Sequence, residues 1–369
     1  MKKAIIFPGK YIQGEGVLAD LGGVVAQLGC KKPMLVWGKR TRAAAADAVI
    51  DGLKANGADY VEWKFGGECT KEEAAAIAAE IKKQGCDIIV GLGGGKCLDV
   101  SKGAAAQLGM RVIVCPTVCS SDAPTSACTV WYDKEGVCQG FDLWPTNPDV
   151  VIVDTGIMVT APKGMLLAGI GDALATYLEA RASNSSHAGT CSGGTPTMSA
   201  IALSKLCFDT LLSDADAALI AVEAGVVTPA YDRIVEACTL LSGLGWESGG
   251  LATAHQLGNN LSAFPEAHAH MHGEKVAFGI VTQLMLDPDA DIDEVYMVVD
   301  FMVEVGLAVT LEDLSMEAVS KERLMEFCVA NTGEGAFTGN HSFPVSAKDL
   351  YNAMLAADAF GKARKAAIL

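Results

Sequence analysis

The stretch Cys-Asp-Ile-Ile-Val-Gly-Leu-Gly-Gly-Gly-Lys-Cys-Leu-Asp-Val-Ser-Lys-Gly, residues 86–103, decides the fold of this chain. An apolar strand over Asp87 to Val90 leads into three consecutive glycines and a lysine, and a helix is expected to begin near Cys97. Glycines let the backbone approach an anion closely, and the first turn of a helix offers unpaired N–H groups and a partial positive charge. The stretch therefore predicts a phosphate cradle, and with it a nucleotide or dinucleotide ligand.

This turn departs from the two commonest phosphate-binding motifs. A dinucleotide fingerprint, G-x-G-x-x-G, that begins at Gly91 requires glycine where Lys96 stands. One that begins at Gly93 requires glycine where Leu98 stands. A P-loop requires Ser or Thr directly after Lys96, and this chain has Cys97 there. A glycine-rich turn without a ligand is the alternative, but the glycines, the lysine and the helix start together favour an anion site.

Strands and helices alternate through the first half of the chain. Thr70 and Glu73 form the pattern of a capping box for a helix that Gly85 closes. Apolar runs and cap signals predict strands at Met34–Trp37, Tyr60–Trp63 and Arg111–Cys115, and helices at Arg42–Ala55, at Thr70 to about Lys83 and at Cys97–Leu108. Repeated β–α–β units with short loops predict a Rossmann-like α/β domain with a parallel sheet covered on both faces. Ligands of such sheets bind at the carboxyl ends of the strands, where the glycine turn lies.

The sequence changes character beyond Pro162. Long segments rich in Ala, Leu and Met follow, and those with an apolar face at helical spacing are Thr197–Leu212, Asp232–Leu244 and Gly273–Leu286. We therefore expect two domains, a nucleotide-binding α/β domain over residues 1–161 and an all-helical domain over residues 162–369. A cleft between two such domains is a favoured place for a ligand.

Composition excludes several classes of partner. The chain has 369 residues, half of them apolar, and a formal net charge of −16, which argues against nucleic acid or an anionic membrane surface as a partner. The first residues, Met-Lys-Lys-Ala-Ile-Ile-Phe-Pro, hold too short an apolar run for a signal peptide, and no segment has the length of a membrane span. The sequence favours a cytoplasmic protein that acts on small molecules.

Twelve cysteines do not form the pattern of a disulfide framework. Most lie in or beside apolar segments, scattered along a long chain. Cys115 and Cys119 are separated by three residues, but no second pair lies nearby to complete a zinc site. We interpret the cysteines as reduced core thiols, as in a cytoplasmic protein.

Histidines gather in one region of the second half. Four of the six lie between residues 255 and 272, namely His255, His268, His270 and His272. Two imidazoles and one carboxylate make the open three-ligand site of a catalytic zinc, and Asp172 is the candidate carboxylate. Each of these residues also has an ordinary interpretation: His268 and His270 as surface or capping side chains, and Asp172 as a charge in the first turn of a helix.

Eight short motifs, in order along nearly the whole chain, resemble those of the glycerol dehydrogenase family, which belongs to the metal-dependent, iron-containing type of alcohol dehydrogenase. The motifs are Pro8-Gly-Lys-Tyr-Ile-Gln-Gly14, Phe65-Gly-Gly-Glu-Cys69, the Gly-Gly-Gly-Lys-x-Leu-Asp99 turn, Ser121-Asp-Ala-Pro-Thr-Ser126, Gly169-Ile-Gly-Asp-Ala-Leu-Ala-Thr176, Leu241-Ser-Gly-Leu-Gly245, Glu247-Ser-Gly-Gly250 and His272-Gly-Glu-Lys-Val-Ala-Phe-Gly279. The resemblance implies the dehydroquinate synthase-like fold of group III alcohol dehydrogenases. It also implies a homo-oligomer, which is an octamer in relatives.

The resemblance also implies an activity and its residues. Hydride would pass between a secondary alcohol, such as glycerol or another vicinal diol, and NAD, with Zn²⁺ held by Asp172, His255 and His272. Relatives that use iron add a histidine where this chain has Thr176, which favours zinc. The same three ligands and Asp122 would meet the substrate. The cofactor would contact the turn, β-strand ends and the loops near them, at Gly38, Gly94, Gly95, Lys96, Thr117, Ser120, Ser126, Cys128 and Tyr132. Asp99 is better explained as holding the turn or capping its helix.

The chain departs from the family pattern at three places. The family usually ends its first Rossmann-type strand with an acidic residue that binds the adenosine ribose, and this chain has Gly38 there, followed by Lys39, Arg40 and Arg42. Loss of the carboxylate and gain of basic groups favour NADP(H) as the cofactor. The alternative is that these basic groups are only surface residues at an exposed helix start. Gln256 to Asn259 and Gly339 to His341 also differ from the usual His-Asn pairs.

Three alternative functions stay open from the sequence. One is an NADP(H)-preferring reductase of hydroxyketones, aldehydes or 2-oxoacids on the same scaffold. Another is a zinc- and NAD-dependent cyclising synthase. Such an enzyme binds polyanionic substrates and should line its site with several Lys and Arg residues, whereas only Arg181 and Lys275 are expected near the candidate site. The third is a nucleotide-binding protein without catalysis, which leaves the three metal ligands without a purpose.

Overall fold

The computed structural model describes residues 1–368, and the chain forms two compact units. The α/β unit comprises Ile6–Leu166 and Ala217–Gly243. The helical unit comprises Met1–Ile5, Leu167–Asp216 and the described chain from Leu244. The chain thus passes between units at four points, and the expected boundary after residue 161 lies near one of them.

A six-stranded parallel sheet, in the order β1-β8-β5-β4-β2-β3, forms the centre of the α/β unit. Its strands are β1 Tyr11–Gly14, β2 Pro33–Trp37, β3 Val61–Lys64, β4 Ile88–Gly93, β5 Val112–Pro116 and β8 Val150–Asp154. Every residue of β2, β4, β5 and β8 is buried. Such continuous apolar burial is what a sheet covered on both faces requires. A separate antiparallel pair joins β6, Cys128–Tyr132, to β7, Cys138–Leu143.

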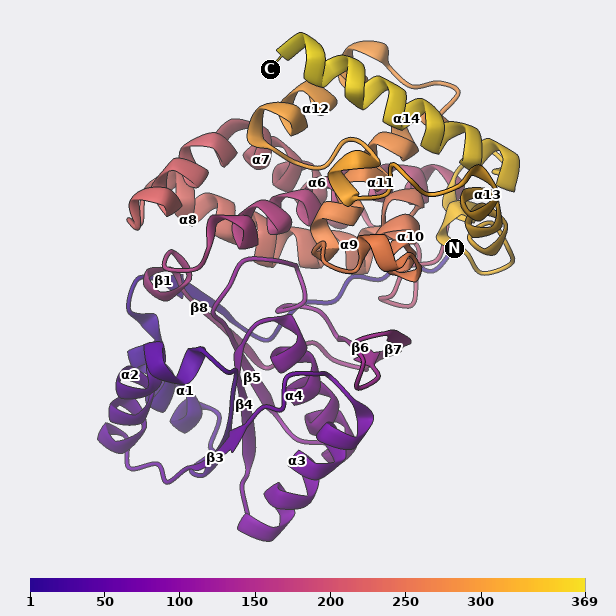
Figure 1. Ribbon diagram of the computed structural model, residues 1–369. Helices are drawn as coiled ribbons and strands as arrows, with labels where there is room; N and C mark the ends of the chain where they lie inside the picture. The colour runs from indigo at the N-terminus through magenta and orange to yellow at the C-terminus, as the bar shows by residue number, and fades with distance from the viewer. Residues whose placement is uncertain (369) are drawn as a thin grey trace. The chain divides into compact units, whose positions relative to one another are not determined.

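Helices cover both faces of this sheet. Figure 1 shows α1 and α2 on one side of it and α3 and α4 on the other. The helical segments of the unit are η1 Val17–Asp20, α1 Leu21–Gln27, α2 Thr41–Ala55, α3 Lys71–Gln84, α4 Gly95–Leu108, α5 Thr155–Met158, α8 Pro229–Glu236 and the π-helical turn Ala237–Leu241. The predicted Rossmann-like α/β fold is confirmed.

The order of the strands places a switch point between β2 and β4. From β2 the chain passes through α2 to β3 at one edge, whereas from β4 it passes through α4 to β5 in the opposite direction. Adjacent strands whose connections leave in opposite directions open a crevice at their carboxyl ends. Gly38 follows β2 and Gly93 ends β4, so the glycine turn lies at that crevice.

The predicted capping box at the N-terminus of α3 is correct in one of its two hydrogen bonds. Thr70 Oγ1 accepts the backbone N–H of Glu73 at 3.1 Å, and Gly85 closes the helix in the left-handed region at φ 68°. The capping box is wrong in its second half, because the Glu73 carboxylate instead accepts from Trp63 Nε1 at 2.9 Å and from the N–H of Gly66 at 3.0 Å.

The helical unit holds the greater part of α6, α7 and α9 and all of the later helices. Its helical segments are α6 Lys163–Ser186, α7 Met198–Ala224, α9 Ser242–Gly249, α10 Thr253–Asn260, η3 Leu261–Ala263, η4 Pro265–Ala267, α11 His272–Leu286, α12 Ile292–Val305, η5 Glu312–Leu314, α13 Lys321–Ala330, η6 Phe337–Asn340 and α14 Ala347–Ile368. The expected helices over 197–212 and 273–286 are confirmed within α7 and α11. The expected helix over 232–244 contains the π-helical turn.

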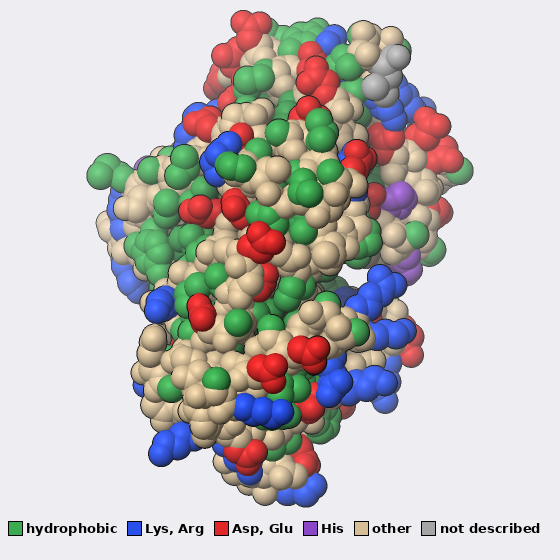
Figure 2. All heavy atoms as spheres, turned by 90° about the vertical axis from the view of Figure 1, so that its left-hand side faces the viewer, with side chains coloured by type: hydrophobic (Ala, Val, Ile, Leu, Met, Phe, Trp, Pro, Cys, Tyr) green, Lys and Arg blue, Asp and Glu red, His purple; other side chains and the backbone are tan. Residues whose placement is uncertain are grey.

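Burial and charge agree with the sequence interpretation. None of the twelve cysteines, all of which lie among the described residues, forms a disulfide. Ten are buried, as expected of core thiols, whereas Cys138 is exposed and Cys191 is half-buried. On the face shown in Figure 2, acidic and basic side chains are mixed with apolar ones. Among the described residues, no helix combines the length and the apolar character needed to cross a bilayer.

Candidate functional site

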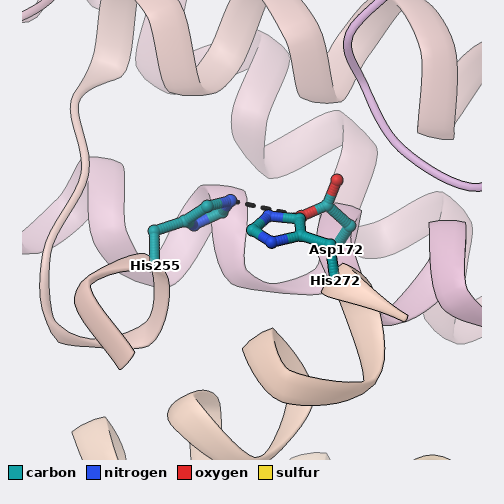
Figure 3. A group of neighbouring side chains, drawn as sticks. All are labelled: Asp172, His255 and His272. Atoms are coloured by element: carbon teal, nitrogen blue, oxygen red, sulfur yellow. Dashed lines mark ion pairs between the residues drawn. The ribbon is translucent and has the colours of Figure 1, made fainter. Parts of the chain in front are cut away.

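Three side chains converge in the helical unit as a candidate metal site. Asp172 Oδ1 lies 3.2 Å from His255 Nε2 and 3.2 Å from His272 Nε2, and one donor atom from each residue lies within 4.8 Å of the others. Figure 3 shows both rings directed at the carboxylate. The Asp172 and His255 side chains are 1% and 7% exposed, whereas His272 is 38% exposed. Two imidazole nitrogens and a carboxylate oxygen are the donor set of an open divalent metal site.

Glycines beside two of these residues let their helices touch. A Cβ on Gly273 would lie 1.7 Å from the carbonyl oxygen of Ala168, and one on Gly171 would lie 2.6 Å from the carbonyl oxygen of Gly273. Only glycine permits this approach of α11 to α6. Because His272 and Asp172 directly neighbour these glycines, the contact brings their side chains together.

Close approach at glycines also joins α10 to α11. A Cβ on Gly258 would lie 2.3 Å from Val276 Cγ2, and one on Gly279 would lie 2.4 Å from the carbonyl oxygen of Ala254. This packing holds the short helix α10, and with it His255, against the helix that begins at His272. The helices α6, α10 and α11 therefore meet through close contacts at glycines.

Glu179 is a functional residue that the sequence did not single out. It lies in α6 and is fully buried, and its carboxylate contacts His255 Nδ1. Burial lowers the pKa of His255, but the carboxylates of Glu179 and Asp172 outweigh it and hold that pKa well above its ordinary value. Burial raises the pKa of Asp172, but the two histidines outweigh it, so that this pKa lies below its ordinary value.

Thr176 lies one helical turn after Asp172, at the position where iron-using relatives add a histidine by the resemblance. It is fully buried. A Cβ on Gly245 would lie 2.3 Å from Thr176 Cγ2, so the space beside this methyl group is closed. The structure accordingly brings three donors together in this cluster, and Thr176 is packed as a small side chain.

The remaining histidines of the region lie outside the cluster. His268 Nε2 contacts the carbonyl oxygen of Ser262 at 2.5 Å, and His270 Nε2 contacts Ser315 Oγ at 3.1 Å. These are the surface roles that the sequence analysis favoured for both.

His341 supports the segment that leads into α10. Its Nε2 lies 2.8 Å from Thr253 Oγ1, and its ring stacks on Phe343 with centroids 4.9 Å apart. Asn340 Nδ2 donates to the carbonyl oxygen of Leu251 at 2.8 Å. Burial lowers the pKa of His341. The Asn340-His341 pair near the C-terminus thus reaches Thr253, two residues before His255.

The candidate cofactor residues at the switch point lie close together. The N–H of Gly38 donates to the carbonyl oxygen of Leu92 at 2.8 Å, and that of Thr117 donates to the carbonyl oxygen of Gly93 at 3.1 Å. Gly94 is the N-cap of α4, without a side-chain cap, and Gly95 is its first residue. The N–H of Cys97 donates to the carbonyl oxygen of Gly94 at 2.9 Å. The N–H groups of Gly95 and Lys96, which precede it in the first turn, are the ones that an anion site would use.

Lys96 and Tyr132, two further cofactor candidates, contact each other. Lys96 Nζ lies 4.5 Å from the centroid of the Tyr132 ring. It also pairs with the Glu68 carboxylate at 2.6 Å. The Lys96 side chain is 40% exposed, so it lies at the surface beside the turn. An aromatic ring and a carboxylate hold its ammonium group.

The loop between β5 and β6 is fixed to α4 by Lys102, a buried residue of that helix. Lys102 Nζ lies 2.8 Å from Asp99 Oδ1 and donates to the carbonyl oxygens of Ala123 at 2.8 Å and Ser126 at 3.2 Å. Asp99 Oδ2 accepts the N–H of Val130 at 2.9 Å. Asp99 therefore holds α4 to β6, rather than holding the glycine turn or capping the helix. The structure seats Ser126 in this contact, buries Cys128 and leaves Ser120 half-buried.

Asp122 is a buried carboxylate of the same loop. Its side chain accepts a hydrogen bond from Ser242 Oγ at 2.7 Å. The carboxylate is thus held within the α/β unit, and the three metal-site residues are held within the helical unit.

Comparisons with known proteins identify the family. A family model described as iron-containing alcohol dehydrogenase matches residues 8–155. The chain is 42% identical to a glycerol dehydrogenase of Escherichia coli O6:H1 over 98% of both chains. It is 38% identical to a glycolaldehyde reductase of Halobacterium salinarum over 96% of this chain and 97% of the relative.

The solved structures give the same answer. The crystal structure of glycerol dehydrogenase from Schizosaccharomyces pombe matches with a TM-score of 0.94 at 32% identity, covering 99% of this chain and 92% of that one. Identity above 30% over nearly the full length of both chains, together with the same fold, decides the relationship. The chain belongs to the glycerol dehydrogenase family of iron-containing-type alcohol dehydrogenases.

Proposed function

We propose that this protein is a metal-dependent dehydrogenase that transfers hydride between a secondary alcohol, such as glycerol or another vicinal diol, and a nicotinamide dinucleotide. The convergence of Asp172, His255 and His272 is the observation that carries the proposal. In the oxidative direction the alcohol carbon gives a hydride to the nicotinamide and the hydroxyl proton leaves to solvent. One alcohol and one NAD(P)⁺ thus give one carbonyl compound, one NAD(P)H and one H⁺.

The three donors have separate tasks in this proposal. A divalent metal ion, when bound, supplies a Lewis acid that makes an alcohol hydroxyl more acidic and polarises a carbonyl group. Asp172 and His255 are buried and hold their donor atoms away from water, whereas His272 is partly exposed. Substrate is therefore expected to approach the donor set past His272. Asp122 is the proposed partner of the substrate hydroxyls.

Zinc is the proposed metal ion. The donor set suits a catalytic zinc site with three protein ligands, and Thr176 occupies the place where a fourth ligand stands in iron-using relatives. The same nitrogen and oxygen donors also suit iron and manganese. Metal analysis of the purified protein, followed by removal with a chelator and separate addition of Zn²⁺, Fe²⁺ and Mn²⁺, distinguishes these ions by the activity that each restores.

The residues after β2 support NADP(H) as a cofactor beside NAD(H). Arg42 is engaged by Glu62 in a bidentate pair at 2.6 and 3.2 Å. Lys39 and Arg40 are exposed, and neither has an ion-pair partner among the described residues. A 2′-phosphate would add the negative charge that these two groups favour.

Gly38 itself has little room for a side chain. An added Cβ would lie 3.1 Å from Thr41 Oγ1 and 3.2 Å from Gly93 Cα, since the end of β2 closely approaches the glycine turn. The first side chain beyond this approach is that of Lys39. We therefore assign the choice between the two dinucleotides to Lys39 and Arg40.

Initial rates test the function and the cofactor together. Oxidation of glycerol and 1,2-propanediol with NAD⁺ and with NADP⁺ is followed by nicotinamide absorbance, with and without added Zn²⁺. The proposal requires diol oxidation that Asp172→Ala and His255→Ala abolish while the fold remains. Retained turnover in either variant contradicts the metal-site assignment. A KM for NAD⁺ far below that for NADP⁺ contradicts the role given to Lys39 and Arg40.

A second candidate function is a reductase that uses NADPH on hydroxyketones, aldehydes or 2-oxoacids. The two unpaired basic groups after Gly38 favour it, and the relative from Halobacterium salinarum carries the name glycolaldehyde reductase. Dihydroxyacetone, glycolaldehyde and a 2-oxoacid, each assayed with NADPH, decide between the two. Faster reduction of these compounds than oxidation of any diol would select the reductase.

Assembly and location complete the proposal. Met198 and Leu206 of α7 are 83% and 52% exposed, which supports a homo-oligomer that covers them. Light scattering of the purified protein measures its mass in solution. Twelve cysteines without a disulfide among the described residues support a reducing compartment such as the cytoplasm.

A further inference from the structure

Glu179 lies on the same helix as the candidate metal ligand Asp172. The two lie seven positions apart along α6, which places them two helical turns apart on one face. The Glu179 side chain is fully buried. A buried carboxylate is costly unless its oxygens are occupied, so its partners indicate what it does.

Both oxygens of Glu179 contact the start of α10. Oε1 accepts the backbone N–H groups of Ala252 and His255, each at 2.8 Å. Ala252 is the N-cap of this helix and has no side-chain cap of its own. The Glu179 carboxylate thus serves as a cap supplied by another helix, and it fixes the backbone from which the His255 side chain projects.

The second oxygen, Oε2, contacts Nδ1 of the His255 ring. A carboxylate whose other oxygen already accepts two N–H groups is an acceptor, and Nδ1 is therefore the donor of this hydrogen bond. In the neutral imidazole the proton then lies on Nδ1 and the lone pair on Nε2. Nε2 is the atom that lies 3.2 Å from Asp172 Oδ1 and faces His272.

We propose that Glu179 is the positioning residue of the metal centre, and this inference rests on the proposed function of that centre. It selects the tautomer of His255 that presents Nε2 to the metal ion. It fixes the ring through one hydrogen bond to Nδ1, and it fixes the backbone that carries the ring through two more. A carboxylate that receives the second N–H of a ligating histidine raises the basicity of the ligand and pre-orients it. Glu179 itself does not contact the metal ion or the substrate.

Glu179→Gln is the sharpest test because it changes little besides the donor pattern. The amide oxygen can still accept the N–H groups of Ala252 and His255. The amide NH₂ then faces Nδ1 and donates to it, so the neutral ring carries its proton on Nε2 and loses its ligand atom. We expect Zn²⁺ affinity, measured by competition with a chromophoric chelator, to fall by about 10–100-fold.

Glu294→Gln is the matched control. Glu294, in α12, pairs with Arg181 of α6 at 2.8 and 2.7 Å. The substitution therefore makes the same carboxylate-to-amide change at a residue that contacts the same helix. Its Zn²⁺ affinity is expected to equal that of the wild type. A fall in Zn²⁺ affinity in Glu179→Gln at a Tm close to that of the control separates positioning from general loss of stability.

A second measurement uses the wild-type protein and does not depend on the folding of a variant. NMR of protein with nitrogen-labelled histidine reports which ring nitrogen of His255 carries the proton and which one shifts when Zn²⁺ is added. We expect a protonated Nδ1 and a zinc-sensitive Nε2. Zinc at Nδ1, or unchanged Zn²⁺ affinity in Glu179→Gln, overturns the inference. Absence of Zn²⁺ binding to the wild type instead overturns the proposed function.

Discussion

The hydroxyl of Ser242 donates a hydrogen bond to Asp122 Oδ2 at 2.7 Å, and both side chains are buried. Ser242 directly follows the π-helical turn Ala237–Leu241. In the same loop as Asp122, Thr125 Oγ1 donates to the carbonyl oxygen of Thr239 at 3.0 Å. A π-helical turn widens the regular backbone ladder, and here one of its carbonyl groups accepts a hydroxyl from the loop. The loop that carries Asp122 is therefore held at two points by this helical segment.

Ser242→Ala removes the hydrogen bond without removing the carboxylate. If Asp122 binds the substrate hydroxyls, we expect KM for glycerol to rise by about fivefold, which corresponds to about 1 kcal/mol for one lost hydrogen bond. The change in kcat should be smaller, because the metal centre is untouched. Steady-state kinetics of Ser242→Ala measure both. Ser213→Ala, at an exposed position of α7 whose hydroxyl bonds only its own helix, is the control. An unchanged KM in Ser242→Ala would separate Asp122 from substrate binding.

Gly243→Ala tests how closely this helix approaches the loop. An added Cβ would lie 1.9 Å from Thr125 Oγ1 and 3.1 Å from the carbonyl oxygen of Asp122. Overpacking of this kind costs about 1–3 kcal/mol, so we expect a lower Tm. Gly23→Ala, in α1, is the matched control because its nearest atom would be Asn56 Oδ1 at 4.0 Å. Helix propensity predicts that this control raises the Tm, and equal Tm values for both variants would contradict the close approach.

Lys102→Met removes a buried ion pair within α4 and the hydrogen bonds that Lys102 donates to the carbonyl oxygens of Ala123 and Ser126 in the loop. The Lys102 side chain is 2% exposed and lies 2.8 Å from Asp99 Oδ1. Removal of one partner leaves an uncompensated buried charge, at a cost of about 3–5 kcal/mol. We expect a large fall in Tm and weaker dinucleotide binding, since the helix of the glycine turn loses its link to the loop. Lys83→Met, which removes an exposed pair with Glu80, is expected to leave both quantities unchanged.

Local signals made much of the fold predictable. The glycine turn, the Thr70 cap and the left-handed Gly85 are each decided by a few neighbouring residues, and the structure has all three. The alternation of strands and helices follows from apolar periodicity, which the parallel sheet requires. The π-helical turn at Ala237–Leu241 leaves no such signal, because its apolar residues fit an ordinary helix equally well.

The site was predictable only where residue type carries the information. His255 and His272 stand out because histidines are few, and Asp172 stands out through the motif around it. In the sequence, Glu179 has the pattern of an ordinary charged residue on a helix surface, because its partners at the start of α10 lie 73 to 76 positions away. Its spacing of two turns from Asp172 was the signal that could have identified it. Lys102 likewise gave no sign of burial. Its pair with Asp99 has the i,i+3 spacing of an ordinary surface pair on a helix, and its carbonyl partners Ala123 and Ser126 become visible only in three dimensions.

Removal of the metal ion is expected to lower the stability of the helical unit. Asp172, His255 and His272 come from three helices, and an ion that binds them only in the folded state stabilises that state. At a free Zn²⁺ concentration of 100 times Kd, linkage predicts about 2.7 kcal/mol. Thermal unfolding with increasing Zn²⁺ should show a rising Tm in the wild type and none in Asp172→Asn. A Tm that Zn²⁺ shifts equally in both proteins would place the ion elsewhere.

Thiol reactivity tests whether the start of α4 stays closed. Burial raises the pKa of the Cys97 thiol to about 12, and Cys97 Sγ lies 3.5 Å from the carbonyl oxygens of Val36 and Leu92. Because the thiolate is the reactive form, an ordinary pKa near 9 would give about a thousandfold more thiolate at pH 8. Cys138 is exposed, so iodoacetamide at pH 8 should label it first. Peptide mapping by mass spectrometry locates the label, and Cys138→Ser should abolish the fast phase. Fast labelling of Cys97 in the native protein would mean that the first turn of α4 opens.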